Sequence, residues 1–199
     1  MDRCAWAGSA PEYVAYHDEE WGVPLHGDDA LFERLSLEAF QSGLSWITIL
    51  RKRENFRAAF DDFHLATVAA YDGDDVRRLL ADAGIVRNRA KIDAAISNAR
   101  AALELRLGLD ELLWSFAPRQ PRPPPATLAD VPATSAASTA MAKELKRLGF
   151  RFVGPTTAYA LMQATGMVDD HVATCWRADG ISPGDPDRTS SWSAGETAG

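Results

Sequence analysis

The chain has 199 residues, of which 46% are hydrophobic and 25% are charged, an ordinary composition for one large or two small globular domains. No apolar run approaches the length of a membrane helix, about 20 residues, and no basic and then apolar leader begins the sequence. We therefore expect a cytoplasmic protein without a membrane span. The formal net charge of −7 argues against a strongly basic, non-specific nucleic-acid binder.

The first 27 residues are rich in aromatic side chains: Trp6, Tyr13, Tyr16 and Trp21 lie within sixteen positions. Tyr13 and Tyr16 have helical spacing, so a short helix would place both on one side. Such a concentration of aromatic residues is typical of a cap on a core, and equally of a pocket for a flat ligand.

Residues 28–42 are predicted to form a helix that is capped by Asp28. Glu38 lies within its apolar run, where a buried carboxylate must be paired, hydrogen-bonded or functional, unless it faces water. Gly43 breaks this helix, and a second helix is expected over residues 46–60.

The middle of the chain continues with helical patterns. Two short helices are expected over residues 63–71 and 73–82, the second of them capped by Asp74. A turn and a long helix that ends near Leu107 follow, and then a short apolar segment at residues 112–116.

Residues 117–125 contain five prolines, which exclude regular helix or sheet and predict an extended connector. The next helix, over residues 135–148, ends at Gly149. After residue 176 the chain is poor in apolar residues, and we expect its tail to be disordered. Strand-like alternation is essentially absent, so the predicted fold class is all-α.

A helical hairpin is predicted where Gly154 and Pro155 form a turn and the first position of a helix that runs to Ala164, with Gly166 as its stop. Backbone N–H groups at such a helix start can hold a phosphate oxygen, although an ordinary core hairpin has the same pattern. Positive charge is clustered despite the net charge, and such patches either bind a DNA backbone or are solvated helix faces. The clusters are Arg51, Lys52, Arg53 and Arg57; Arg87, Arg89 and Lys91; and Lys143, Lys146, Arg147 and Arg151.

Several motifs in order, from Met1 to about Trp176, resemble the 3-methyladenine DNA glycosylase I family of the helix-hairpin-helix DNA glycosylase superfamily. They are Arg3-Cys4-x-Trp6, Tyr16-His17-Asp18-x-Glu20-Trp21-Gly22-Val23-Pro24, Leu37-Glu38-x-x-Gln41-x-Gly43-Leu44-Ser45-Trp46, Phe150-Arg-Phe-Val-Gly-Pro-Thr-Thr-Ala158 and Val168-Asp-Asp-His171-x-x-x-Cys175.

The resemblance implies a helix-hairpin-helix bundle and an enzyme that hydrolyses the N-glycosidic bond of 3-methyladenine in alkylated double-stranded DNA, the first step of base-excision repair. It implies one glycosylase unit over residues 1–177, in which residues 1–27 and about 164–177 form a zinc-binding subdomain, followed by a tail over 178–199. We expect a monomer.

The cysteines Cys4 and Cys175 lie near opposite ends of the chain, so a disulfide in a secreted protein and a metal site in a reducing compartment are both conceivable. His171 and Cys175 are four residues apart and would share one face of a helix. The resemblance makes Cys4, His17, His171 and Cys175 the family's zinc site. Four protein ligands leave no open position, so the implied zinc is structural.

The resemblance also assigns the extruded base to Glu38, Trp46, Tyr16 and Trp21, with Tyr13 and Trp6 as outer members. The chemistry agrees, because 3-methyladenine in DNA is cationic: aromatic faces attract a flat cation, and a carboxylate accepts hydrogen bonds from the adenine amine. The alternative is a set of core aromatic residues with an exposed glutamate.

The hairpin has Thr156 where many superfamily members carry a lysine that attacks the sugar. A threonine cannot form a Schiff base, so the implied enzyme is a glycosylase without lyase activity. Gly154 at the helix start is the expected contact to the DNA backbone, and Gly43 and Leu44 are the expected probe that fills the space of the flipped base. Asp169 stands at the position of the superfamily's catalytic aspartate, where it could also be only a helix cap.

Two other functions remain open from the residues. The first is a non-catalytic, zinc-stapled DNA- or nucleotide-binding module. The second is a zinc hydrolase, which would need a shell of only three protein ligands and an open position.

Overall fold

The computed structural model describes residues 2–178, so the predicted disordered tail lies almost entirely outside the described residues. The regular structure of the described part is helical throughout and contains no strand, which confirms the all-α prediction. The α-helices are α1 (Pro11–Glu19), α2 (Asp28–Gln41), α3 (Trp46–Ala59), α4 (Leu65–Ala70), α5 (Gly73–Ala81), α6 (Arg89–Leu103), α7 (Gly108–Trp114), α8 (Ala136–Arg147) and α9 (Pro155–Ala164). Three short 3-10 helices, η1 (Ala5–Ala7), η2 (Asp61–Phe63) and η3 (Leu128–Asp130), lie between them.

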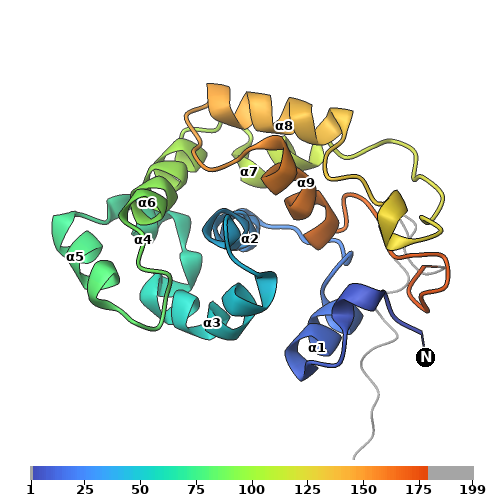
Figure 1. Ribbon diagram of the computed structural model, residues 1–199. Helices are drawn as coiled ribbons and strands as arrows, with labels where there is room; N and C mark the ends of the chain where they lie inside the picture. Colours follow the sequence, from blue (N-terminus) through green and yellow to red (C-terminus); the bar gives the residue numbers. More distant parts are fainter. Residues whose placement is uncertain (1, 179–199) are drawn as a thin grey trace, which may run out of the picture.

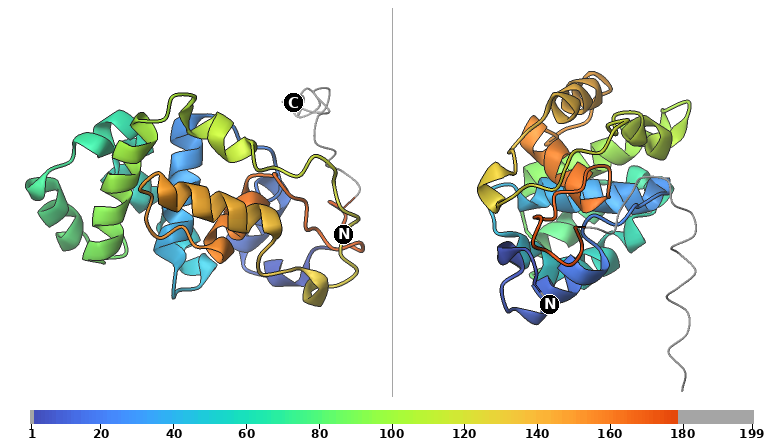
Figure 2. Two further views of the ribbon diagram at one scale, coloured as in Figure 1. Left: turned by 90° about the horizontal axis from the view of Figure 1, so that it is seen from above. Right: turned by 90° about the vertical axis from the view of Figure 1, so that its right-hand side faces the viewer.

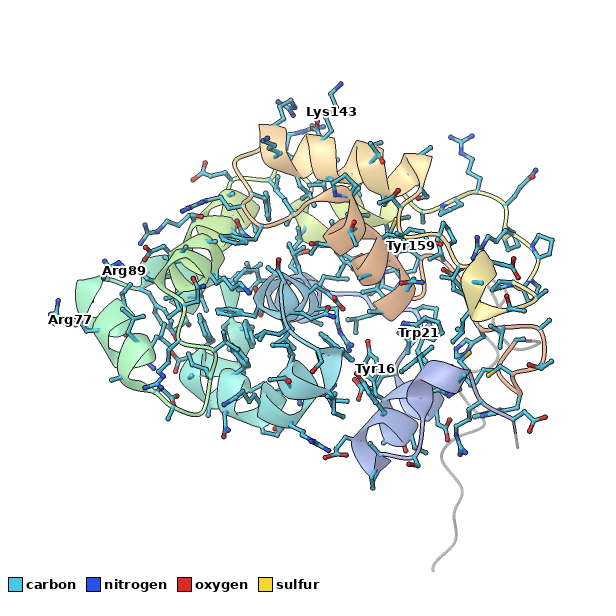
Figure 3. All side chains as sticks on the ribbon, in the orientation of Figure 1. Tyr16, Trp21, Arg77, Arg89, Lys143 and Tyr159 are labelled. Carbon is cyan, nitrogen blue, oxygen red and sulfur yellow. The ribbon has the colours of Figure 1, made fainter. Side chains whose placement is uncertain are left out.

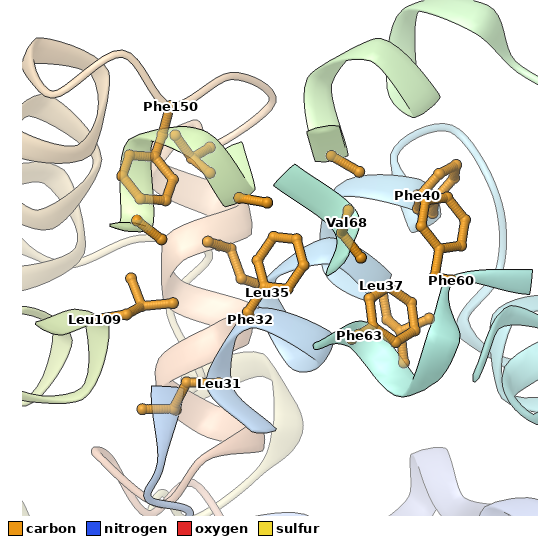
Figure 4. Close-up of a cluster of buried hydrophobic side chains, with 14 of the residues drawn as sticks. Leu31, Phe32, Leu35, Leu37, Phe40, Phe60, Phe63, Val68, Leu109 and Phe150 are labelled. Atoms are coloured by element: carbon orange, nitrogen blue, oxygen red, sulfur yellow. The ribbon is translucent and has the colours of Figure 1, made fainter. Parts of the chain in front are cut away.

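Helix α2 is the centre of the bundle, and Figure 1 shows it nearly end-on with α3, α4, α6, α7 and α9 around it. Its residues from Arg34 to Phe40 are buried without interruption, so the helix has no solvent face along this stretch. Leu31, Phe32 and Leu35 pack with Phe63 and Leu109 in the core of Figure 4. The position of α2 explains why polar residues within it, Glu38 included, are buried.

Helices α8 and α9 form the predicted hairpin. Gly149 follows α8 with φ +92°, Gly154 is the N-cap of α9, and Pro155 is its first residue. The side chain of Asn98 on α6 accepts from the N–H of Arg151 at 2.8 Å and donates to its carbonyl at 3.0 Å. A buried amide therefore fixes the connecting loop to the bundle.

The two ends of the described chain meet. The N–H groups of Gly22 and Leu25 donate to carbonyls of Gln163 and Thr165 at the end of α9, and the N–H of Trp176 donates to Asp2. The proline-rich connector joins this junction through a hydrogen bond from the N–H of Ala173 to the carbonyl of Pro125. Both views in Figure 2 place the segment after α9 beside the N-terminal segment that precedes α2.

Three local predictions were wrong. Asp28 does not cap α2: Gly27 is the N-cap, and the Asp28 carboxylate accepts from the N–H of Asp110 at 2.8 Å instead. Helix α5 is capped by Asp72, whose carboxylate accepts from two N–H groups, and not by Asp74. His171 and Cys175 do not share a helix: residues 171–172 have no regular structure, and residues 173–178 form turns and a bend.

The side chains of the first basic cluster are paired with groups of the protein itself. Arg51, Arg53 and Arg57 pair with Glu12, Glu20 and Glu33. Lys52 donates to the carbonyls of Ala83 and Gly84. For this cluster the solvated-face alternative is closer to the structure than a DNA-binding patch.

Lys91, from the second basic cluster, is buried. Its ammonium donates to the carbonyls of Phe40 at 2.9 Å and Ser42 at 2.6 Å. It thus satisfies carbonyls at the end of α2 and holds the loop that follows, where Gly43 and Leu44 lie.

None of the helices in residues 2–178 combines the length and the apolar composition that crossing a membrane requires.

Gly166 allows the close contact at the junction. Its φ is +71°, and a Cβ there would lie 2.7 Å from the nitrogen of Pro24 and 2.8 Å from the oxygen of Gly22. We expect Gly166→Ala to lower the free energy of unfolding by about 2–5 kcal/mol, from backbone strain and steric overlap together. Gly149→Ala is the matched control, because its φ of +92° carries the strain but nothing lies within 4 Å. Urea unfolding of both variants measures the difference, and equal losses would contradict a close contact at Gly166.

Candidate functional site

A pocket of about 300 Å³ opens between α1, α2, α3 and α9. All six predicted base-binding side chains line it, although they come from positions 6 to 46 and from four different elements. Its lining residues are Trp6, Tyr13, Tyr16, Trp21, Glu38, Gln41, Trp46, Leu128, Val131, Ala160, Gln163 and Asp170. Tyr16 and Trp21 point into the space between α1 and the end of α9 in Figure 3.

Glu38 is the buried carboxylate of this pocket, with 5% of the residue exposed. No other side chain or N–H group within residues 2–178 donates a hydrogen bond to it. Burial raises the pKa of Glu38 to about 7, and the nearby positive charge of Arg34 opposes this rise. A pocket carboxylate with a raised pKa and no donor among residues 2–178 is the pattern of a binding or catalytic group rather than of a structural ion pair.

Aromatic rings form the walls. The ring centroids of Tyr16 and Trp46 are 5.4 Å apart, and those of Trp6 and Trp21 are 5.0 Å apart. The indole Nε1 of Trp46 is buried and has no acceptor among the described residues. Tyr13 is fixed, since its hydroxyl accepts from the N–H of Ile47 in the first turn of α3 at 3.0 Å. The pocket therefore offers flat apolar faces and a carboxylate to which no residue within 2–178 donates a hydrogen bond.

The pocket contains a second carboxylate, Asp170, which the sequence reasoning missed. Its two oxygens accept from the guanidinium of Arg122 at 2.5 Å, the hydroxyl of Tyr159 at 2.7 Å and the amide of Gln163 at 2.7 Å. No pattern in the sequence connects these residues, because the connector, α9 and the C-terminal turns meet only in the folded chain.

Asp169, the predicted catalytic position, does not line the pocket. Its carboxylate accepts from the N–H of His171 at 3.0 Å, so in the structure it supports the turn that carries His171.

Cys4, His17, His171 and Cys175 are all buried, and their donor atoms lie within 4.8 Å of one another. The Nε2 of His17 is 3.4 Å from the Cys175 sulfur, and the Nδ1 of His171 is 3.5 Å and 3.6 Å from the sulfurs of Cys175 and Cys4. Around a tetrahedral zinc ion, bond lengths of about 2.3 Å to sulfur and 2.0–2.1 Å to nitrogen give S···N separations of roughly 3.5–3.6 Å. The group could therefore hold a metal ion.

Further contacts orient the side chains of this group. The other ring nitrogen of His17 lies 2.8 Å from the Asp18 carboxylate, and that of His171 lies 3.2 Å from the Trp21 carbonyl. The sulfurs of Cys4 and Cys175 accept backbone N–H groups at 3.5 Å. Such contacts fix the orientation of ligand side chains before a metal binds.

The group of Cys4, His17, His171 and Cys175 also supports one wall of the pocket. Cys4 is the N-cap of η1, which carries Trp6, and the Trp21 ring lies edge-on to His171 with centroids 4.6 Å apart. Trp6, Trp21, Cys4 and Cys175 pack in one small cluster apart from the main core.

The residues expected to contact DNA flank the pocket. Leu44 is 41% exposed in the loop between Gln41 and Trp46, and Gly43 has φ +82° there. Gly154 and Thr156 are exposed at the start of α9, the helix that carries Gln163. Lys143, labelled in Figure 3, projects away from α8 on the same hairpin.

A carboxylate at the base of an aromatic pocket, beside an exposed hairpin with a helix start, defines a protein that binds a flat, hydrogen-bonding ligand such as a nucleobase. The chain belongs to the methyladenine glycosylase family, whose sequence profile matches residues 6–178.

Relatives with this fold are similar over almost their whole length. The DNA-3-methyladenine glycosylase 1 of Escherichia coli (strain K12) is 49% identical over 187 residues, which cover 92% of this chain and 100% of that protein. A crystal structure of a 3-methyladenine DNA glycosylase I has a TM-score of 0.85 at 48% identity and covers 88% of this chain and 98% of its own. A variant of such an enzyme in complex with 3-methyladenine has a TM-score of 0.84 at 34% identity, covering 89% and 98% of the two chains.

The raised pKa of Glu38 has a consequence for stability. Because the folded pKa of about 7 lies above the ordinary value of 4.5, the contribution of Glu38 is complete below about pH 4.5 and is lost as the pH rises through 7. We expect Glu38→Gln to remove this loss, so that the variant gains roughly 2–4 kcal/mol relative to the parent between pH 5 and pH 8. Urea unfolding of both proteins at the two pH values measures the change. A stability difference that is the same at both would contradict a desolvated carboxyl.

Proposed function

We propose that this chain is a glycosylase without lyase activity that hydrolyses the N-glycosidic bond of 3-methyladenine in alkylated DNA and so initiates base-excision repair. The observation that carries the proposal is the buried Glu38 carboxylate, which has no partner among residues 2–178 and lies at an aromatic pocket of about 300 Å³. The relatives with the same fold are named for this activity.

The pocket suits a base that has left the DNA stack. Tyr16, Trp21, Trp46 and the outer rings of Tyr13 and Trp6 supply faces that attract a flat cation. Glu38 contacts the base directly. Its carboxylate accepts a hydrogen bond from the exocyclic amine of adenine and would repel the carbonyl oxygen of guanine. Selectivity for methylated adenine then follows from charge and from hydrogen bonding together.

Glu38 acts as the ionised partner of the base and not as a general acid. Methylation has already made the adenine cationic, so the leaving base departs as a neutral molecule and needs little proton transfer. A cation in the pocket lowers the pKa of an adjacent carboxyl and keeps it ionised. Because the pKa of Glu38 is raised in the free protein, the free protein binds substrate productively only after Glu38 has lost its proton.

The reaction places positive charge on the sugar, and a carboxylate that faces the pocket stabilises it. Of the two neighbouring aspartates, Asp170 lines the pocket but is already paired with Arg122, and Asp169 supports His171, so Glu38 is the carboxylate available for this role. For Asp169 we propose positioning rather than contact with the sugar.

The α8–α9 hairpin is proposed as the helix-hairpin-helix element that grips the DNA backbone at Gly154 and Thr156. Thr156 has no amine, so the reaction stops at base release and the backbone is not cleaved. Leu44, on the Gly43 turn, is the proposed wedge that holds the base step open.

The group Cys4, His17, His171 and Cys175 is proposed to bind one structural zinc ion per chain. Bound zinc would supply a cross-link between the chain ends and no step of the reaction, because four protein ligands leave no open position. We further propose a monomeric, cytoplasmic protein with residues 1–177 as its single functional unit, in which residues 1–27 and about 164–177 form the zinc subdomain. The second cluster of buried residues, separate from the main core, supports this division.

The alternative is a non-catalytic module that binds DNA or nucleotides through the same pocket and hairpin. Both functions predict base binding, and only the glycosylase predicts release of free 3-methyladenine from DNA.

Release of 3-methyladenine from methylated duplex DNA tests the proposal, and its pH dependence tests the role of Glu38. We expect kcat/KM to fall as the pH drops below about 7, because Glu38 becomes protonated in the free protein. Glu38→Gln should lower kcat/KM by roughly 10- to 100-fold and remove this acid limb. The absence of release would favour the non-catalytic module. A basic limb that disappears in Glu38→Gln while base binding stays intact would make Glu38 the general acid.

The hairpin is tested at Gly154, which has φ −71° and no atom within 4 Å of an added Cβ. We expect Gly154→Glu to weaken binding of duplex DNA by about tenfold through repulsion of phosphates and to leave binding of free 3-methyladenine unchanged. Gly154→Ala is the control, since it adds bulk without charge and fits the backbone. Equal losses of DNA and base binding in Gly154→Glu would mean that the substitution only perturbs the fold.

Metal analysis tests the zinc proposal. Protein purified without chelator should contain about one zinc per chain. Cys175→Ser should lose the metal and lower both the melting temperature and the activity, whereas Thr174→Ser, at the exposed neighbouring position, should not. Metal-free protein with full stability would contradict the proposal.

A further inference from the structure

Arg34 is buried on α2, one helical turn before Glu38. Its Nη1 donates to the hydroxyl of Tyr16 at 3.1 Å, and its Nη2 donates to a carboxylate oxygen of Glu20 at 3.1 Å. Its guanidinium carbon also lies 5.4 Å from the centroid of the Tyr16 ring. Buried arginines are rare without a partner, and here one of the two partners is a wall of the main pocket.

Arg34 does not line the main pocket. It lines instead a second, smaller pocket of about 260 Å³ together with Glu20, so its side chain lies behind the Tyr16 wall. Glu20 is held there by a second cation, Arg53, at 2.5 Å and 2.8 Å. Arg34 therefore acts on a bound base only through Tyr16 and through its charge.

The direction of the hydrogen bond decides what Tyr16 can do. An arginine can only donate, so the Tyr16 oxygen is the acceptor and its own proton points to another acceptor. Tyr16 is buried and lines the pocket together with Glu38, so its proton is directed to the side where a bound base would present its ring nitrogens. A charged donor on the oxygen also strengthens the hydrogen bond that the hydroxyl gives.

The charge of Arg34 acts on Glu38 directly. Of the groups in residues 2–178 that share the pocket with Glu38 or lie close behind it, α1 contributes the tyrosines Tyr13 and Tyr16, and α3 and α9 contribute the neutral Trp46 and Gln163. The segment after α9 contributes the carboxylate Asp170, and α2 contributes Arg34 as the cation. Asp170 is neutralised by Arg122, which leaves Arg34 as the counter-charge for Glu38.

We propose that Arg34 is a positioning residue for base recognition, which orients the Tyr16 hydroxyl as a donor into the pocket and supplies the positive charge that favours ionised Glu38. The inference rests on the proposed glycosylase function, because the base is the ligand toward which both groups are arranged.

The test compares Arg34→Met with Arg53→Met. Both remove a cation from Glu20, but only Arg34 contacts Tyr16, so Arg53→Met is the matched control. We expect Arg34→Met to move the acid limb of kcat/KM for release of 3-methyladenine up by about one pH unit. It should also weaken binding of free 3-methyladenine by about tenfold, and Arg53→Met should leave both properties near those of the parent.

A double-mutant cycle with Tyr16→Phe separates positioning from packing. Without the hydroxyl, Arg34 has no proton to orient, so the losses in base affinity from Arg34→Met and Tyr16→Phe should be strongly non-additive. Arg34→Lys provides the second variant if Arg34→Met does not fold. Because Arg34→Lys keeps the positive charge, the acid limb of kcat/KM should stay at the same pH. The coupling energy with Tyr16→Phe should fall.

The outcomes are distinct. An acid limb that stays in place in Arg34→Met, or additive losses in the cycle, would overturn the role of Arg34 while the glycosylase function stands. Unchanged coupling in Arg34→Lys would overturn it equally. A parent protein that releases no 3-methyladenine would overturn the proposed function and this inference together.

Discussion

The arrangement of the site depends on one constraint, the burial of the Glu38 carboxylate inside the central helix of the bundle. Because α2 is enclosed by other helices, Glu38 is buried without a hydrogen-bond donor within the described residues, and its pKa rises to about 7. A carboxylate in this state is costly for the free protein and favourable for a ligand that brings a positive charge and N–H donors. The same burial that destabilises the free protein therefore makes the pocket bind a cationic base in preference to a neutral one.

The aromatic side chains of the pocket are fixed by residues that lie mostly outside its lining. Arg34 and Glu20 fix Tyr16 from behind, Ile47 fixes Tyr13, and the group around Cys4 and His171 fixes Trp6 and Trp21. The two ends of the described segment, residues 2–178, therefore complete a site whose carboxylate lies in the middle of the fold. The close contact at Gly166 is the backbone requirement for this closure.

Much of the fold could be predicted from local sequence, because Gly149, Pro155 and the apolar spacing of each segment act within one or two turns. The N-caps were less predictable, since Asp28 leaves its own helix to bind the backbone of Asp110. The aromatic residues and Glu38 could be assigned through the family motifs, and their residue types agree with the chemistry. Asp170 could not be found, because its role in the pocket arises from contacts with Arg122, Tyr159 and Gln163 that only tertiary structure creates.

The protonation state of Glu38 in the free and base-bound protein tests this account most directly. Isotope-edited infrared difference spectroscopy, with Glu38→Gln to assign the band, would follow the protonated carboxyl across pH 5 to 9. The account predicts that this band is lost in the free protein with a midpoint near pH 7 and that binding of a cationic 3-methyladenine nucleoside analogue with an uncleavable glycosidic bond moves this midpoint to lower pH. A carboxyl that is fully ionised at pH 5 in the free protein, or one that gains its proton when the base binds, would contradict the account.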